Sequence, residues 1–327
     1  MKRTVIYVLE AGSVSGGVRV VYEHLNHLRA RGWHVEVYSL DGNRPTWFSL
    51  NPNIPWVRFG NYVSLSRHLS TRKAVKVATW HKTALPVMEA SAPGEGFYFV
   101  QDVESNYYTA PRMKQAVMET YDLPLTKFTD SICAEDELED CPFIGLGIDL
   151  SLYRYLEGTS RQINSVLSLS RPQRLKGWST HCEAYRKLHH TGKFTLYSFG
   201  TTGIHPPYSA PLPAGIPDEE LVKFYNKTGL FLTTSIHEGF SLTPLEAMAC
   251  GAVVICTEAG GNMVYVRNRE NCLLVPPNDA QAVVDACQEI VSDLDLASRL
   301  QEGGFETVKE WPWEPVIDSL EQIYGAA

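Results

Sequence analysis

Short β-rich apolar runs alternate with amphipathic helical stretches along nearly the whole chain, and this alternation constrains the fold most strongly. Strands are predicted over residues 4–10 and 34–40, with a helix over 18–31 between them that stops at Gly32. Such alternation is typical of an α/β protein, in which helices cover both faces of a parallel sheet. Further strands are predicted over 56–59, 75–80, 97–101 and 131–134, with helices over 65–73, 85–90 and 113–121.

The alternation is interrupted once, near residues 150–161, where the sequence becomes polar and turn-prone, and we place a domain linker there. A chain of 327 residues is long enough for two domains. Each half therefore indicates a doubly wound domain, which binds ligands at the carboxyl ends of its strands. In the second half, strands are predicted over 163–169, 194–199, 230–234, 253–256 and 273–275, with helices over 178–189, 218–226, 279–291 and 316–324.

The composition is that of an ordinary soluble globular protein, with 44% hydrophobic and 20% charged residues. No segment approaches the roughly 20 apolar residues of a membrane span. The apolar run at the start is interrupted by Glu10, so we interpret it as a first strand and not as a signal peptide. The seven cysteines form no CxxC pair, which favours neither zinc nor a disulfide framework and fits a reducing, cytoplasmic location.

Charge is distributed unevenly along the chain. The net charge of −8 argues against general binding of nucleic acid. Residues 1–82, however, contain twelve Lys or Arg against four acids. This basic first quarter could contact an anionic acceptor or an anionic membrane surface, which would make the protein peripheral to the inner membrane face. The alternative is a solvated basic face that has no partner.

Residues 230–251 combine a buried strand, a sharp turn and the start of a helix. Gly239 allows the turn, and Ser241 is a candidate N-cap of the helix. The positive N-terminal end of such a helix suits a phosphate. Glu238 and Glu246 flank the turn, and carboxylates accept hydrogen bonds from the vicinal hydroxyls of a sugar or ribose. The alternative is an ordinary helix start with one capping acid and one surface acid.

Two further loops offer contacts to phosphate. Gly12, Gly16 and Gly17 follow the first strand but do not match the G-x-G-x-x-G dinucleotide fingerprint. These glycines indicate either a helix start whose bare backbone N–H groups can bind a phosphate, or simply a tight turn between strand and helix. Arg171 and Lys176 follow the first strand of the second half, and on one loop they can clamp a diphosphate. The alternative for this second loop is a solvated basic segment.

Taken together, these motifs resemble the retaining glycosyltransferases of family 4, which have the GT-B fold of two Rossmann-like domains facing across a cleft. The resemblance rests on Gly16-Gly17, the loop from Arg171 to Lys176-Gly177, and the stretch Glu238-x7-Glu246, with support from residues 216–225, 249–254 and 271–279. It implies an N-terminal acceptor domain over residues 1–155, a donor domain over 156–310, and a C-terminal helix at 311–327 that packs back on the first domain.

The resemblance also implies a role for each residue of the donor site. Arg171 and Lys176 would bind the pyrophosphate of a nucleotide sugar. Glu246 would hold the ribose hydroxyls and Glu238 the transferred sugar. Backbone N–H groups at the turn would contact sugar and phosphate, and two glycines would approach from the other domain. The implied donor set is Gly16, Gly17, Arg171, Lys176, Glu238, Gly239, Phe240, Ser241, Leu242, Thr243 and Glu246.

The chain departs from these relatives on the acceptor side. Gln101 stands where many of them have a histidine, and glutamine cannot act as a titrating base. His81 follows the preceding strand and could reach either sugar, or it could be a packed or capping histidine. Asp102 and Glu104 are acceptor-side candidates that could instead cap the next element. Residues 99–104, together with Tyr107-Tyr108 and Thr120-Tyr121, are similar to a rhamnan-type subset of rhamnosyltransferases that uses dTDP-L-rhamnose.

We therefore predict a retaining hexosyltransferase-type glycosyltransferase (EC 2.4) that acts in polysaccharide, glycan or glycoconjugate biosynthesis. Its donor would be a UDP-, GDP- or dTDP-sugar, and its acceptor a hydroxyl of a glycan or a lipid-linked sugar. The catalytic candidates are Arg171, Lys176, Glu238 and His81. The alternatives are a GT-B sugar-nucleotide epimerase or hydrolase, and a non-catalytic module that binds nucleotide sugars.

No metal or other cofactor is predicted for this reaction. The only Asp-x-Asp sequence, Asp293-Leu294-Asp295, follows the end of a predicted helix, where we expect a solvated surface turn. Arg171, Lys176 and the helix N-terminus would neutralise the leaving diphosphate in place of a divalent ion.

Overall fold

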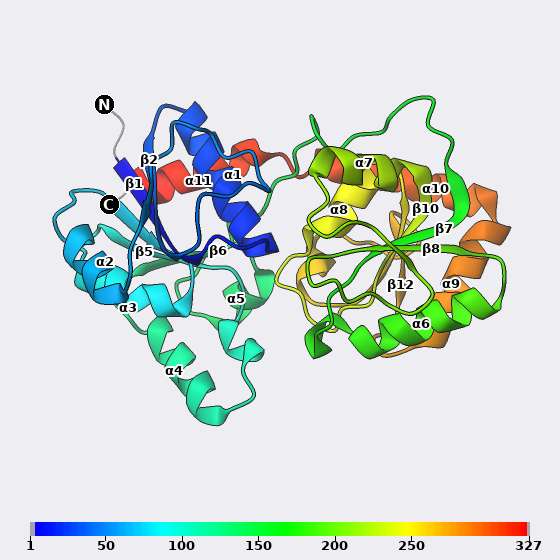
Figure 1. Cartoon of the computed structure of the whole chain (residues 1–327), viewed down its shortest axis with the longest axis horizontal. Helices are drawn as coiled ribbons and strands as arrows, with labels where there is room; N and C mark the ends of the chain where they lie inside the picture. The colour runs from blue at the N-terminus through cyan, green and yellow to red at the C-terminus, as the bar shows by residue number, and fades with distance from the viewer. Residues whose placement is uncertain (1–3, 326–327) are drawn as a thin grey trace. The chain divides into compact units, whose positions relative to one another are not determined.

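The computed structural model describes residues 4–325, which form two compact units. The division falls after Leu146 and after Pro312, where the sequence predicted boundaries after residues 155 and 310. The last helix, α11 (Trp313–Gly325), belongs to the first unit and is drawn in red among its blue elements in Figure 1. Lys2 and Arg3 of the basic first quarter lie outside the described residues. Within residues 4–325, no helix is both long and apolar enough to cross a bilayer.

The first unit is built on a parallel sheet in the order β3-β2-β1-β4-β5-β6. This is the strand order of dinucleotide-binding sheets, in which the direction of winding reverses between β1 and β4. In register, Val5 of β1 lies between Val35 of β2 and Val75 of β4. The strands are β1 (Thr4–Ala11), β2 (His34–Asp41), β3 (Trp56–Arg58), β4 (Val75–Ala78), β5 (Gly96–Val100) and β6 (Thr126–Thr129).

Helices cover both faces of this sheet. The helices are α1 (Gly16–Ala30), α2 (Tyr62–Leu69), α3 (His81–Glu89), α4 (Pro111–Tyr121), α5 (Ile132–Glu137) and α11, with a short 3₁₀ turn η1 (Glu104–Tyr107). Side chains of α2 to α5 bury one face, together with Ile6 and Tyr98 of the strands. On the opposite face, the hydroxyl of Tyr7 lies 2.6 Å from that of Tyr324 on α11. Arg31 at the end of α1 pairs with two acids of α11, so this helix completes the first unit.

The prediction of a strand at residues 131–134 is wrong. The strand is β6, which ends at Thr129, and the apolar residues that follow begin α5. The hydroxyl of Ser131 accepts the Ala134 N–H at 3.3 Å and caps this helix. A serine followed by a short apolar run is compatible with either element, and here the cap decides in favour of the helix.

The second unit repeats the first in topology. Its sheet has the order β12-β11-β10-β7-β8-β9, so the winding reverses between β7 and β10. Leu230 and Leu232 of β10 join the core on one face, while Phe231 between them packs on Tyr225 from the other face. The strands are β7 (Gln162–Leu169), β8 (Thr195–Phe199), β9 (Ala210–Pro211), β10 (Thr228–Thr233), β11 (Val253–Thr257) and β12 (Cys272–Val275).

The helices of this unit are α6 (Trp178–His190), α7 (Asp218–Lys227), α8 (Leu242–Ala249), α9 (Ala280–Ser292) and α10 (Leu294–Lys309), with the 3₁₀ turns η2 (Arg174–Lys176) and η3 (Gly261–Val264). The sequence did not predict α10. Asp293, which we expected in a surface turn, is its N-cap, because its carboxylate accepts the Leu296 N–H at 2.9 Å. An acid between two adjacent helices therefore caps the second one.

Candidate functional site

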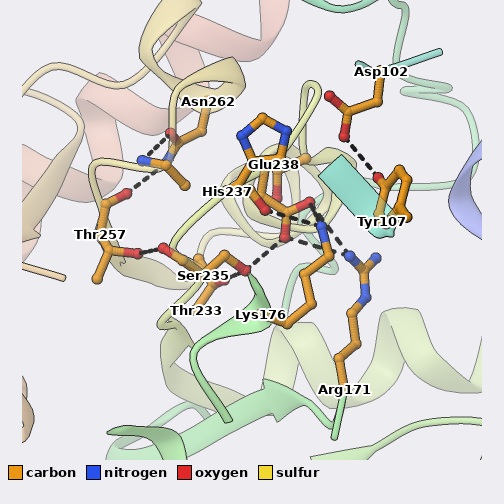
Figure 2. Close-up of polar contacts among 12 residues, drawn as sticks. Asp102, Tyr107, Arg171, Lys176, Thr233, Ser235, His237, Glu238, Thr257 and Asn262 are labelled. Atoms are coloured by element: carbon orange, nitrogen blue, oxygen red, sulfur yellow. Dashed lines mark hydrogen bonds and ion pairs between the residues drawn. The ribbon is translucent and has the colours of Figure 1, made fainter. Parts of the chain in front are cut away.

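The candidate site lies at the point in the second sheet where the winding reverses. The strands β7 and β10 are parallel neighbours there, and each is followed by a loop that the sequence singled out. Arg171 and Lys176 lie on the loop after β7, and Glu238 lies on the loop after β10. Figure 2 shows these three side chains pointing toward one another. Residues that are 62 and 67 positions apart in sequence thus meet because their strands are adjacent.

The carboxylate of Glu238 is the centre of this cluster. The ammonium of Lys176 lies 2.9 Å from Oε2 and also donates to the backbone oxygen of His237 at 3.0 Å. The hydroxyl of Ser235 donates to Oε1 at 2.6 Å. Arg171 Nη1 lies 3.4 Å from both carboxylate oxygens. The Lys176 and Glu238 side chains are 7% and 8% exposed, whereas Arg171 is 33% exposed, so only the arginine has room to move.

The electrostatic balance of the cluster favours an anion. Burial raises the pKa of Glu238, but the charges of Arg171 and Lys176 and the Ser235 hydroxyl outweigh burial and hold the pKa below its ordinary value. The carboxylate is therefore ionised at neutral pH. Two cations and one anion leave a net positive charge in a partly buried site, where charged interactions are screened less than in water.

The loop that carries the cations is pinned to the end of β10. The backbone oxygen of Leu175 accepts the N–H groups of Ile236 and His237, at 2.8 and 3.0 Å. At Gly177 the backbone has φ +61°, and a Cβ would lie 1.8 Å from the backbone oxygen of Thr234. A side chain at position 177 would therefore push this loop away from the strand.

A second backbone attachment fixes Glu238 itself. Its N–H donates to Ala259 at 2.8 Å, and its oxygen accepts the Gly261 N–H at 2.9 Å, which ties the loop after β10 to the loop after β11. A Cβ at Gly261 would lie 2.0 Å from the backbone oxygen of Gly239. The amide of Asn262 bonds the backbone of Thr257 and Ala259 and holds the second loop in shape.

Ser241 stands at the N-cap position of α8 but does not act as the predicted cap. Its backbone is left-handed, with φ +78°, and its side chain makes no capping bond. The hydroxyl of Tyr265 donates to its backbone oxygen at 2.5 Å and holds this unusual conformation. The first N–H groups of α8 consequently have no side-chain cap, which leaves them available to an anion.

A small pocket opens beside this cluster. Its wall contains the predicted residues Arg171, Lys176, Glu238 and Thr243, and it adds Leu169, His181, Thr233, Thr234 and Ser235, for which the sequence indicated no role. Most of the additions are hydroxyl side chains at the end of β10. A hydroxyl both donates and accepts, so this end of the pocket can bond a ligand of either kind.

Burial decides the charge of His181, and a chain of hydrogen bonds contacts its ring. Burial lowers its pKa to about 3, so the ring is neutral. Tyr185 Oη lies 2.8 Å from the backbone oxygen of Tyr197, which can only accept, and 2.6 Å from Ser168 Oγ. The hydroxyl of Tyr185 is the donor toward both oxygens. His181 Nε2 lies 2.8 Å from Ser168 Oγ, which joins the histidine to this chain of hydrogen bonds.

Other members of the predicted donor set occupy different surroundings. Glu246 lies one turn into α8 and is buried, with Oε2 accepting the hydroxyl of Tyr225 at 2.9 Å. It is not part of the pocket wall, and its role toward a ribose stays a prediction. Phe240 packs its ring on Trp311 and Tyr265 and so offers a ligand only its backbone. Leu242, at the start of α8, is half-buried.

The predicted glycines of the first unit form the first turn of α1, which begins at Gly16 and not at the predicted residue 18. Ser15 caps this helix by accepting the Val18 N–H at 3.2 Å. A Cβ at Gly17 would lie 1.8 Å from the side-chain oxygen of Gln101, whereas one at Gly16 would meet nothing within 4 Å. The structure therefore brings together Gly17 and Gln101, and only Gly17 is closely approached.

His81 and Glu104 are linked to each other. His81 is the buried first residue of α3, and its backbone N–H donates to Glu104 Oε2 at 2.7 Å. Its ring Nε2 lies 2.8 Å from the hydroxyl of Tyr108. Glu104 thus caps α3, an earlier element of the chain, and not the next element as the sequence suggested; its acceptor-side role stays a prediction. Burial raises the pKa of Glu104 to about 8. The bond from the His81 N–H lowers this pKa and the nearby Asp102 raises it, but burial has the largest effect.

Part of the second unit matches a known family. Residues 212–307 match the family model described as glycosyl transferases group 1. The chain is 32% identical over 108 residues to the D-inositol 3-phosphate glycosyltransferase of Corynebacterium jeikeium, an alignment that covers 33% of this chain and 26% of that protein. The chain is 34% identical over 116 residues to the enzyme of the same name from Rhodococcus jostii. That alignment covers 36% of this chain and 25% of that protein. The chain thus spans about a quarter of the length of the curated relatives it matches.

Solved structures resemble the chain over its whole length. The sucrose-phosphate synthase from Thermosynechococcus elongatus matches with a TM-score of 0.81 and 18% identity, covering 99% of both chains. The Anabaena protein HepE in complex with UDP-glucose matches with a TM-score of 0.81 and 14% identity, covering 99% of this chain and 100% of that one. Two parallel six-stranded sheets with flanking helices, together with these neighbours, establish the GT-B fold of two Rossmann-like domains.

Proposed function

We propose that the protein is a glycosyltransferase that moves a sugar from a nucleotide-diphosphate donor to an acceptor hydroxyl. The observation that carries the proposal is the cluster of Arg171, Lys176 and Glu238 beside the uncapped start of α8. It has a net positive charge and uncapped N–H groups, which suit a diphosphate. Further support comes from the family match of residues 212–307 and from HepE, which was solved with UDP and with UDP-glucose.

The two cations have different tasks in this proposal. Lys176 is held by His237 and Glu238 and presents a fixed charge to the phosphate. Arg171 is more exposed and only loosely bonded to Glu238, so it can turn to bind the diphosphate with both ends of its guanidinium. As the bond to the sugar breaks, negative charge grows on the leaving phosphate. Donors that are already in place stabilise this charge without reorganisation.

We also propose that transfer retains the anomeric configuration and needs no metal, as expected for family 4. Both oxygens of Glu238 are engaged, Oε1 by Ser235 and Oε2 by Lys176, so this carboxylate orients the site and does not attack the sugar. The leaving phosphate itself would take the proton of the acceptor hydroxyl on the same face. Arg171, Lys176 and α8 together would supply the positive charge that a divalent ion supplies elsewhere.

The finer assignments are also proposals. We propose that the enzyme is cytoplasmic and that its basic first quarter contacts a membrane surface. We also propose that it extends a glycan or a lipid-linked acceptor during glycoconjugate biosynthesis. Either UDP-glucose or dTDP-L-rhamnose is a reasonable first donor, the former by likeness to HepE and the latter by the resemblance at residues 99–104, 107–108 and 120–121. A donor panel separates these two possibilities directly.

The test is a thermal-shift panel of UDP-, GDP- and dTDP-sugars, followed by measurement of nucleotide release with and without candidate acceptors. We expect one donor class to raise the melting temperature and nucleotide release to depend on acceptor. Release without acceptor would indicate a hydrolase, and a changed sugar without release an epimerase. Binding without turnover would indicate a binding module, and no shift with any donor would overturn the proposal. Activity that survives EDTA would support metal independence.

Variants of the cation loop make the same test specific. Lys176→Ala should lower kcat at saturating donor by at least about 100-fold, because the charge acts on the leaving group. Arg174→Ala is the matched control, since Arg174 is an exposed cation on the same loop that is not part of the pocket wall. We expect this control to change kcat less than about twofold. A Lys176 variant with a higher KM and an unchanged kcat would contradict the leaving-group role.

A further inference from the structure

The carboxyl edge of the first sheet carries a cluster of aromatic rings that the donor chemistry does not use. Trp80 and His81 follow β4, while Tyr107 and Tyr108 follow β5 at the end of η1. The ring centroids of Trp80 and His81 are 4.8 Å apart, and those of Trp80 and Tyr107 are 6.2 Å apart. Tyr108 meets His81 edge-on at 5.5 Å. Two loops therefore combine into one aromatic surface at the edge where α/β sheets bind ligands.

This surface is held in position through polar atoms at its rim. Tyr107 is 44% exposed, yet its hydroxyl donates to Asp102 Oδ2 at 2.7 Å, as Figure 2 shows. Asp102 is itself buried, and its Oδ1 accepts the Val103 N–H at 2.8 Å. His81 is fixed in the same way by the hydroxyl of Tyr108. An exposed but immobilised tyrosine offers contact area to a ligand at little cost in conformational entropy.

The charges near this surface narrow the kind of ligand it can take. Burial raises the pKa of Glu104 and of Asp130, and the nearby carboxyl group of Asp102 raises both further. The carboxylate of Asp102 would repel an anionic ligand placed beside it. A neutral ligand with both an apolar face and hydroxyl groups would match aromatic rings beside a carboxylate.

We propose that Trp80 and Tyr107 form a subsite for a neutral sugar ring of the acceptor, with Asp102 accepting a hydroxyl of that sugar. A pyranose presents C–H groups on one face and hydroxyls at its rim, which is the pattern that this surface complements. The inference rests on the proposed glycosyltransferase function and deepens it, because it makes the acceptor a neutral saccharide. A lipid chain would also cover the aromatic faces, but it has no hydroxyl to donate to Asp102.

The first experiment measures saccharide binding without any donor. Saturation-transfer NMR of the whole protein with a panel of neutral disaccharides, the corresponding sugar phosphates and octyl alcohol separates the ligand classes. We expect neutral disaccharides to bind and the sugar phosphates to bind at least about tenfold more weakly. Preferential binding of sugar phosphates or of the alcohol, or no binding by any neutral saccharide, would overturn the inference. The proposed function is tested separately by the donor panel, so either can fail alone.

Variants then assign the subsite to its residues. Trp80→Ala and Tyr107→Ala should each raise the acceptor KM about tenfold, with donor KM unchanged within about twofold. Tyr107→Phe keeps the ring and loses only the bond to Asp102, so a smaller rise of about threefold is expected. Tyr208→Ala removes an exposed tyrosine of the second unit and is the control. A rise in donor KM equal to that in acceptor KM would mean that the rings only support the fold, and an unchanged acceptor KM would also overturn the assignment.

Discussion

The two units bury a glutamate at the same edge of the same kind of sheet, yet they hold it in opposite charge states. Glu238 lies beside Arg171 and Lys176, and its pKa is lowered although burial alone would raise it. Glu104 has no cation within bonding distance among residues 4–325, and burial raises its pKa to about 8. Depth of burial is similar at both sites, so the neighbours decide the charge. The second unit is thereby suited to an anion and the first to a neutral ligand.

The largest effect that tests this comparison is expected for Glu238→Gln. Loss of the carboxylate leaves Lys176 buried without a counter-charge, which should lower the free energy of unfolding at pH 7 by about 3 kcal/mol. Because the folded pKa lies below the ordinary value of 4.5, this contribution is complete above pH 4.5 and is lost as pH falls through the folded pKa. The difference between wild type and variant should therefore shrink in acid.

Urea unfolding of both proteins at several pH values measures this difference. Glu258→Gln is the matched control, since Glu258 is an exposed acid just after β11 in the same unit. The control should change stability by less than about 0.5 kcal/mol. Equal losses in the two variants would show that the ion pairs of Glu238 do not stabilise the fold.

The same substitution at Glu104, Glu104→Gln, should raise stability at alkaline pH, where Glu238→Gln lowers it. The folded pKa of about 8 exceeds the ordinary 4.5, so the folded state keeps a proton that the unfolded state releases between these values. Stability then falls as pH rises through this window, by up to about 1.4 kcal/mol per pH unit. Glu104→Gln cannot titrate and should be more stable than wild type at pH 8.

Chemical unfolding at pH 5, 6.5 and 8 checks this expectation, with the exposed Glu139→Gln as control. Asp130, whose pKa burial also raises, should leave a residual slope in every variant. If the Glu104 variant and wild type lose stability in parallel between pH 5 and pH 8, Glu104 is not the titrating group.

A third comparison concerns glycines that are closely approached in the two units. Gly261→Ala places a Cβ 2.0 Å from a backbone oxygen, which cannot move away without breaking the attachment of Glu238. We expect a loss of about 1–3 kcal/mol of stability together with a loss of activity. Gly17→Ala meets only the flexible end of Gln101 and should cost less than about 1 kcal/mol. Thermal unfolding measures both, and a larger loss at Gly17 would reverse this interpretation.

The smallest effect distinguishes two helix starts. Ser15→Ala removes a hydroxyl that caps α1 and should cost about 1 kcal/mol. Ser241→Ala removes a hydroxyl that makes no capping bond to α8 and should change stability by only a few tenths of a kcal/mol. Melting temperatures of the two variants suffice for the comparison. A loss at Ser241 as large as that at Ser15 would mean that its hydroxyl does support the helix.

Sequence reasoning was most successful where a pattern is local. The alternation of strands and helices predicted both sheets, because periodicity along the chain reflects which face of an element is buried. It was wrong for residues 131–134 and missed α10, since short apolar runs and acids between helices have more than one structural interpretation. Arg171, Lys176 and Glu238 could be selected in advance, because their loops follow predicted strands and their charges suit a diphosphate.

The remaining parts of the site had no local signal. Ser235 bonds Glu238 and Asn262 shapes the loop after β11, and both bonds are local in sequence. They contribute to the site only because the loops after β7 and β11 meet the loop after β10. The role of Ser241 was misjudged because a serine at a helix start usually caps it, whereas here Tyr265 holds the backbone in a left-handed conformation. Contacts between loops are decided by strand order, which no short motif encodes.

The sequence by itself determined the class of fold and supplied the charged and hydroxyl-bearing groups of the candidate site. Only the tertiary structure decided which of these groups meet and which charge each one carries. Glu238 gains two cations because the winding of its sheet reverses between β7 and β10, while Glu104 gains only a backbone N–H, a hydroxyl neighbour and other acids. The pKa of a buried carboxyl depends on the charges within a few ångströms, and those are set by packing and not by position along the chain.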